Sequence, residues 1–210
     1  MNKRGDLSCK EFLTELASAA PAPGGGGGAA MAGALAAALA SMVANLTIGK
    51  EKFAEREPEV KELLKQAEAE RVRLLQLADD DAAVFNSFMS CYKLPKTTDE
   101  EKEARTAAIR AAAKQAATVP LNIARSSFAV LKLADRLVVS GNPGVITDGA
   151  CSGLLARAAL RCAEYNVRIN LGLTKDEVWN AQATADLKQL LADAEALETH
   201  LLAVTDKALQ

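Results

Sequence analysis

Residues 20–50 hold the feature that most constrains this chain: two prolines, then five glycines, then an alanine-rich run. Pro21 and Pro23 precede Gly24–Gly28, and the run Ala29–Ala44 follows. Proline restricts the backbone, whereas glycine allows a sharp turn and close approach by another molecule. We expect a turn at 24–28 and a helix over 26–48, whose free N–H groups and positive end favour an anion. The alternative is a turn before a helix that packs closely on a neighbour.

Composition favours an all-α protein, and a length of 210 residues suits one domain or two small ones; we expect a single domain, residues 1–210. Half of the residues are hydrophobic, many of them alanine, and only 4% are aromatic. The net charge of −2 provides no basic field, so we expect neither nucleic acid nor a membrane as a partner. The apolar run 24–48 is long enough to span a bilayer, but its Gly/Ala composition and its polar residues argue against that. The first residues lead into no apolar segment, so we expect no signal peptide.

Cysteine and histidine usage argues against a metal site. The four cysteines, at positions 9, 91, 151 and 162, show no C-x-x-C motif, and His200 is the one histidine. We therefore expect free, buried thiols. With a single histidine, a catalytic Ser-His-Asp triad or Cys-His dyad is also disfavoured.

Helix-start signals divide the chain into six helices. The pattern Ser/Thr-x-x-Glu recurs at Ser8, Thr98 and Thr174, and Pro58 suits a first helical turn. Helices are predicted at 8–20, 26–48, 58–93, 99–140, 148–171 and 174–208, with a bend at Pro120. No stretch alternates as a strand would. The expected fold is all-α: a multihelical up-and-down bundle of long antiparallel helices.

One carboxylate interrupts an apolar strip along the third predicted helix. Alternating steps of four and three residues define a single helix face: Val60, Leu64, Ala67, Arg71, Leu74, Ala78, Asp81, Phe85, Phe88 and Tyr92. A carboxylate there is costly unless it is paired or solvated in a cleft. Asp81 is therefore either a site residue or half of a structural ion pair with an arginine on another helix.

Other polar residues carry two readings each. Asp148 follows the loop 141–147 and either caps a helix or serves a site. Asn166 and Asn170 share a helix face, where their amides either read the edge of a heterocycle or cap the helix end. Lys50 directly follows the alanine-rich helix, where a lysine is usually solvated.

These segments together resemble the cyclodeaminase/cyclohydrolase family of folate enzymes. The resemblance rests on Pro21-Ala-Pro-Gly-Gly-Gly26, Ser41-Met-Val-Ala-Asn-Leu-Thr-Ile-Gly-Lys50, Asp81-x-x-x-Phe85, Thr147-Asp148 and Asn166-Val-Arg-Ile-Asn170, and it covers nearly the whole chain. Residues 92–102 and the fourth and fifth glycines look more like the cyclohydrolase branch. Where the family usually has Ala-Gly after the aspartate, this chain has Gly149-Ala150.

The resemblance implies an all-helical cytosolic homodimer that needs no metal or cofactor and takes a tetrahydrofolate derivative as its substrate. It implies hydrolysis of 5,10-methenyltetrahydrofolate to 10-formyltetrahydrofolate; the alternatives are a formimidoyltetrahydrofolate cyclodeaminase and a non-catalytic folate-binding protein. The resemblance indicates only that the quoted segments line the site.

Residue chemistry suggests individual roles. Asp81 is the expected base or partner of the cationic carbon. Lys50 and Asn45 would orient water or substrate, while Asp148 and Asn170, with Asn166 on the same face, would hold the pterin edge. The backbone of Gly24, Gly25 and Gly26 would lie against the folate.

Overall fold

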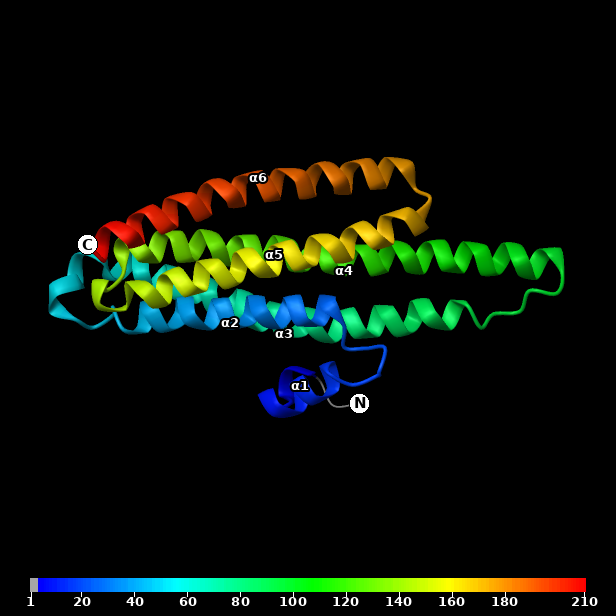
Figure 1. The fold of residues 1–210 in the computed structure, drawn as a ribbon, viewed down its shortest axis with the longest axis horizontal. Coiled ribbons are helices and arrows are strands. Elements are labelled where there is room, and N and C mark those ends of the chain that lie inside the picture. Colours follow the sequence, from blue (N-terminus) through cyan, green and yellow to red (C-terminus); the bar gives the residue numbers. More distant parts are fainter. Residues whose placement is uncertain (1–3) are drawn as a thin grey trace.

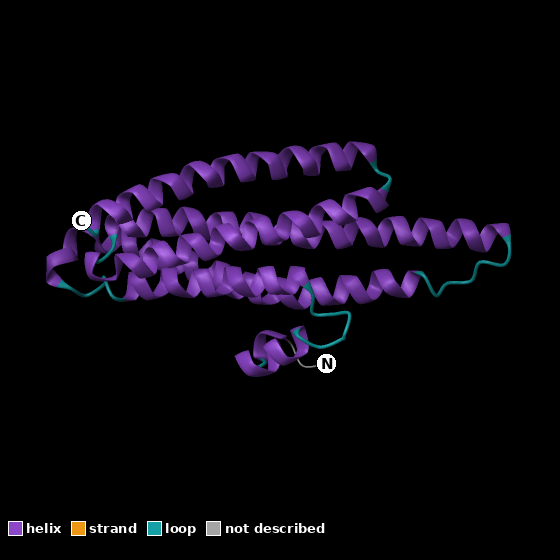
Figure 2. Cartoon of the chain, in the orientation of Figure 1, coloured by secondary structure: helices purple, strands orange, loops and turns teal. Residues whose placement is uncertain are grey.

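The structure is a computed structural model that describes residues 4–210, and every regular element in that range is a helix (Figure 1, Figure 2). The α-helices are α1 (Cys9–Leu16), α2 (Gly25–Asn45), α3 (Glu57–Cys91), α4 (Asp99–Ser140), α5 (Ile146–Thr174) and α6 (Glu177–Ala208). Short 3-10 helices are η1 (Arg4–Asp6), η2 (Glu51–Arg56) and η3 (Pro143–Val145). The prediction of an all-α bundle of long helices is confirmed.

Four long helices form the bundle. In Figure 1, α2 and α5 make a front layer over α3 and α4, and α6 runs along α4 and α5. Figure 1 also shows α1 outside the bundle, and the ends of α3 and α4 that the loop 92–98 joins reach beyond the other helices. Because α2 and α5 run antiparallel, the N-terminus of α2 lies beside the C-terminal part of α5.

Small residues on α2 let its neighbours approach closely. A Cβ added at Gly33 would lie 3.0 Å from Ser127 Oγ and 3.1 Å from a methyl group of Leu74. On the α5 side, the Ser152 hydroxyl donates to the Ala36 carbonyl at 2.7 Å. By length and composition α2 could cross a bilayer, but 61% of its most apolar window is buried inside the protein. Its inward side packs on α3, α4 and α5 in the core of the bundle.

The glycine tract is mostly helical, which corrects the expected turn. Gly24 is the N-cap residue in extended conformation, and Gly25 to Gly28 already belong to α2. The chain instead turns over residues 17–24, before the helix. These glycines permit close contacts with other helices rather than a change of chain direction.

Two of the three predicted capping boxes are present. Ser8 pairs with Glu11 and Thr98 with Glu101 in reciprocal hydrogen bonds. The third prediction is wrong, because α5 continues through Thr174 and α6 begins after Asp176, whose carboxylate accepts from the Trp179 N–H. Helix α4 continues through Pro120 without a break.

Asp148 does not cap a helix, which corrects that reading. Helix α5 begins at Ile146, so Asp148 lies inside its first turn.

The cysteines are free, as expected, but the expectation that they are buried is wrong. Cys9, Cys151 and Cys162 are exposed, and Cys91 is half-buried. Cys151 and Cys162 lie on the outward side of α5, the side that also presents Leu154 and Tyr165 to solvent.

Candidate functional site

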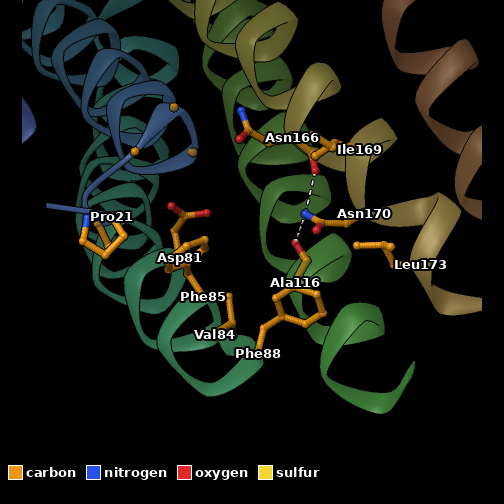
Figure 3. Close-up of a pocket in the computed structure, with 14 residues that line it drawn as sticks. Pro21, Asp81, Val84, Phe85, Phe88, Ala116, Asn166, Ile169, Asn170 and Leu173 are labelled. Atoms are coloured by element: carbon orange, nitrogen blue, oxygen red, sulfur yellow. Dashed lines mark hydrogen bonds between the residues drawn. The ribbon is translucent and has the colours of Figure 1, made fainter. Parts of the chain in front are cut away.

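A cavity of about 360 Å³ opens where the first turn of α2 meets α3 and the C-terminal part of α5 (Figure 3). This volume lies within the usual range of small-molecule sites. The lining residues come from five segments of the chain: Pro21, Ala22, Gly24, Gly25, Gly26, Asp81, Val84, Phe85, Phe88, Ala116, Asn166, Ile169, Asn170 and Leu173. Six of the residues predicted from the sequence are among them: Gly24, Gly25, Gly26, Asp81, Asn166 and Asn170.

Asp81 provides the carboxylate of this cavity. It is half-buried on α3 and lies against the first turn of α2. A Cβ added at Gly26 would be 2.6 Å from its Cγ and 2.7 Å from its Oδ2, so only glycine leaves room for this carboxylate. The N-cap residue of α2, Gly24, has no side chain of its own to cap the helix. The positive end of the helix therefore favours negative charge where Asp81 lies.

Arg71 is the other charged residue on the α3 strip that carries Asp81. Arg71 forms an ion pair of 2.7 Å with Glu68 on the same helix, and this contact raises the pKa of Arg71 and lowers that of Glu68. Among the described residues that line the cavity there is no lysine, arginine or histidine.

Two asparagines from consecutive turns of α5 face Asp81 across the cavity (Figure 3). The amide of Asn166 donates to the Cys162 carbonyl at 2.9 Å and lies beside Gly25, where an added Cβ would be 3.3 Å from Nδ2. The amide of Asn170 donates to two backbone carbonyls, those of Ala116 and Asn166. Both amides are held by hydrogen bonds at the cavity wall.

The remaining wall is apolar. Phe85 and Phe88 belong to the strip that the sequence analysis identified on α3, whereas Ile169 and Leu173 were not singled out there. A flat heterocycle can lie against such a wall, while the carboxylate meets a cationic atom or accepts a proton. The spacing of three and four residues from Asn166 could have identified Ile169, Asn170 and Leu173 as one face of α5.

Three further predicted residues lie at the opposite end of the bundle. Asn45 ends α2, Lys50 follows it, and Asp148 lies in the first turn of α5. Asn142 joins these segments, because its N–H donates to Thr47 Oγ1 at 2.9 Å and its amide to the Leu46 carbonyl at 3.1 Å. The length of α2, about 30 Å at the rise of an α-helix, separates this end from the cavity. A single chain therefore does not bring the nine predicted residues together.

No metal centre is evident in the part of the chain that the structure describes: no three His, Cys, Asp or Glu side chains are placed to hold an ion. The expectation that the reaction needs no metal stays a prediction.

Comparison with known proteins places the chain among folate enzymes. A family model described as formiminotransferase-cyclodeaminase matches residues 8–189. A methenyltetrahydrofolate cyclohydrolase from Methylorubrum extorquens is 44% identical over 94% of this chain and 95% of its own length. The formimidoyltransferase-cyclodeaminase of Sus scrofa is 32% identical over 88% of this chain, which spans only 34% of that longer protein.

A solved structure has the same fold. The crystal structure of a formiminotetrahydrofolate cyclodeaminase from Thermotoga maritima matches with a TM-score of 0.88 and 29% identity, over 98% of both chains. The family match covers most of the chain, and the relative from Methylorubrum extorquens is aligned over nearly its full length. The chain therefore belongs to the formiminotransferase-cyclodeaminase family.

Proposed function

We propose that this protein hydrolyses 5,10-methenyltetrahydrofolate to 10-formyltetrahydrofolate, without a metal or other cofactor. The observation that carries the proposal is the Asp81 carboxylate, set on an otherwise largely apolar cavity wall against the first turn of α2. The similarity to a methenyltetrahydrofolate cyclohydrolase over nearly both full lengths supports the same activity.

The substrate is a cation, so its bridging carbon is already electrophilic. In the first step a water oxygen bonds to the carbon between N5 and N10, and Asp81 accepts a proton from that water. In the second step N5 takes a proton, the C–N5 bond breaks, and the formyl C=O forms on N10 as the hydroxyl proton leaves. The reaction consumes one water and releases one proton. A carboxylate beside a cationic carbon also stabilises the bound substrate by charge.

A second activity shares the same intermediate. In a formimidoyltetrahydrofolate cyclodeaminase, N10 attacks the formimino carbon and ammonia leaves, which produces methenyltetrahydrofolate. The fold match to a formiminotetrahydrofolate cyclodeaminase favours keeping this candidate. The higher identity to the cyclohydrolase favours hydrolysis as the main reaction.

Purified protein is assayed by the loss of methenyltetrahydrofolate absorbance, in parallel with ammonia release from 5-formimidoyltetrahydrofolate. We expect hydrolysis well above the uncatalysed rate, unchanged by exhaustive treatment with a chelator. Ammonia release without hydrolysis would favour the cyclodeaminase. Chelation that abolishes the activity, with recovery on adding zinc, would contradict the metal-free mechanism.

We also propose a cytoplasmic homodimer that forms through the outward side of α2 and α5, here called the α2–α5 face. Its apolar residues are exposed on the single chain: Leu35 56%, Met42 37%, Leu46 39%, Leu154 42%, Tyr165 60% and Ile169 72%. No charged residue occurs between Gly25 and Asn45, and a helix apolar on all sides normally has all its sides covered. A face of this kind marks an interaction site.

A second copy of the chain is the partner that suits this face, because one end of the face carries a carboxylate and the other end carries a lysine. Leu35 and Leu154 lie near its middle, the cavity with Asp81 lies at one end, and Lys50 lies at the other. A two-fold axis near Leu35 places the Lys50 end of each protomer beside the cavity of its partner. The cavity, which no lysine or arginine lines among the described residues, then gains a cation from the second chain.

A further inference from the structure

Pro120 leaves one backbone carbonyl of α4 without its usual donor within the helix. Pro120 lies in the interior of the helix sequence, is buried, and has no N–H. In an α-helix the N–H of each residue donates to the carbonyl four residues earlier, which here is the carbonyl of Ala116. Ala116 is itself buried at the cavity wall. A buried carbonyl without a donor is costly, so this one needs a partner from outside the helix.

Asn170 on α5 is that partner. Its Nδ2 donates to the Ala116 carbonyl at 2.9 Å, and its second amide hydrogen goes to the Asn166 carbonyl at 2.8 Å (Figure 3). Both partners are carbonyl oxygens, which only accept. The NH₂ group must therefore face them, and the chemistry of the neighbours fixes which way the amide is turned.

The same two bonds determine what Asn170 offers a ligand. With both amide hydrogens used, Oδ1 is the polar atom of this half-buried side chain that is left for the cavity. We propose that Asn170 acts only as an acceptor, for an N–H donor of the bound pterin ring, and that Pro120 is the positioning residue that holds it in this state. This proposal rests on the proposed function, because it takes the pterin of a folate as the ligand.

Any other residue at position 120 would bring an N–H of its own. That N–H would donate to Ala116 along the helix, and the bond from Asn170 would become a second, weaker bond to the same oxygen. The amide of Asn170 would then be free to rotate and present either end to the ligand. The proline therefore acts on the ligand only through the asparagine.

A double-mutant cycle tests this coupling, with kcat and KM for methenyltetrahydrofolate measured on wild type, Pro120→Val, Asn170→Ala and the double variant. We expect Asn170→Ala to raise KM about tenfold, the loss of one well-placed hydrogen bond. Pro120→Val, which retains most of the side-chain volume, should raise KM about threefold in the wild-type background and leave it unchanged in the Asn170→Ala background. We expect kcat to change little in both single variants.

Val119→Ala, at the neighbouring buried position of α4, controls for altered packing and should leave KM unchanged. Independent, additive effects of the two substitutions on KM, or an unchanged KM in Asn170→Ala, would overturn the proposal. Calorimetric titration of the same proteins with folic acid separates it from the proposed function. If the two substitutions are coupled in their effects on the dissociation constant of folic acid but no variant or wild type hydrolyses methenyltetrahydrofolate, the inference holds and the proposed function fails. If the wild-type protein binds no folic acid, the inference fails as well.

Discussion

Gly26 and Asp81 function as a unit at the scale of single residues. The glycine belongs to the first turn of α2, where an added Cβ would overlap the carboxylate from α3. A side chain at this position therefore acts first on the carboxylate and only then on the ligand. The neighbouring Gly24 has no atom within 4 Å of an added Cβ, so the two glycines differ sharply in what they permit.

We predict that Gly26→Ala impairs catalysis and that Gly24→Ala does not. If Asp81 is the base, Asp81→Asn should lower kcat by at least about 100-fold. In Gly26→Ala the new methyl group displaces the Asp81 carboxylate, so kcat should fall toward the value of Asp81→Asn. Single-turnover hydrolysis and circular dichroism on the same samples provide the measurement. Equal activity in Gly26→Ala and Gly24→Ala, with both folded, would contradict a catalytic position for Asp81.

Sequence reasoning identified several cavity residues but not all of them. Asp81 could be found because a carboxylate breaks an apolar strip, and Asn166 and Asn170 because polar side chains repeat at four residues. Ala116 could not be found from its own side chain, because it contributes a backbone carbonyl that becomes available only through the proline four residues later. Pro21 and Ala22 line the cavity through the path of the chain before α2, which local patterns do not define.

At the scale of elements, the junction of α5 and α6 shows how two overlapping signals compete. Thr174 and Asp176 both suit an N-cap, and the sequence analysis placed the helix start at the first. In the structure Asp176 caps α6, while the Thr174 hydroxyl bonds to the side chain of Asn180. Asp176 also pairs with Lys114 of α4 at 2.7 Å, a contact between helices that no local pattern contains. Tertiary contact decides between two local candidates here.

We predict that Asp176 stabilises the folded protein at neutral pH and that this contribution is lost in acid. Its hydrogen bond from Lys114, and then that from the Trp179 N–H, lower the pKa of its carboxyl below the ordinary 3.8. A lowered pKa in the folded protein adds stability that is fully present above the unfolded value and is lost as the pH falls through the folded value. Asp176→Asn, which keeps an acceptor for the cap, should lower the urea midpoint at pH 7.

The difference between Asp176→Asn and wild type should shrink as the pH falls below about 3.8 toward the lower pKa of the folded protein. The wild-type carboxyl protonates first in the unfolded chain and then, at the lower pH, in the folded protein as well. Lys114→Gln serves as the partner control and should also lower the midpoint at pH 7. A constant difference between pH 7 and pH 3 would show that the pair does not stabilise the fold.

At the scale of the whole molecule, antiparallel packing separates residues that sequence motifs group together. Helix positions could be predicted from caps and periodicity, because those signals are local. Which helix ends meet depends on packing between helices far apart in the sequence, so the division into two groups at opposite ends of α2 could not be predicted. In the proposed homodimer the α2–α5 face, with its exposed Leu35 and Leu154, would bring the two groups together.

We predict that two inactive variants restore each other when they form a hybrid dimer. Asp81→Asn and Lys50→Ala are co-expressed with different tags and purified through both. In such a hybrid one cavity carries both substitutions, while the other combines an intact Asp81 with an intact Lys50 from the partner. Hydrolysis should recover to about half of the wild-type rate per dimer, as the symmetry of a two-site dimer requires.

Adding Leu35→Glu to both chains should abolish association and recovery, as light scattering after gel filtration can show. Val178→Glu is the matched control, because Val178 is 84% exposed on α6, outside the α2–α5 face, and should leave the dimer intact. Lack of recovery in a hybrid that is demonstrably dimeric would place Lys50 outside the cavity of the partner.

The single tryptophan of the sequence gives this molecule an optical reporter in a useful place. Trp179 lies in the first turn of α6, partly buried against the core, with Lys114 Nζ 5.4 Å from its ring centroid. Lys114 is half a turn before Ala116, and Leu173 of the cavity wall is three residues before Asp176. The emission of Trp179 therefore reports on the α5–α6 junction, which directly follows Leu173 of the cavity wall, so ligand titrations can be followed by native fluorescence without a label.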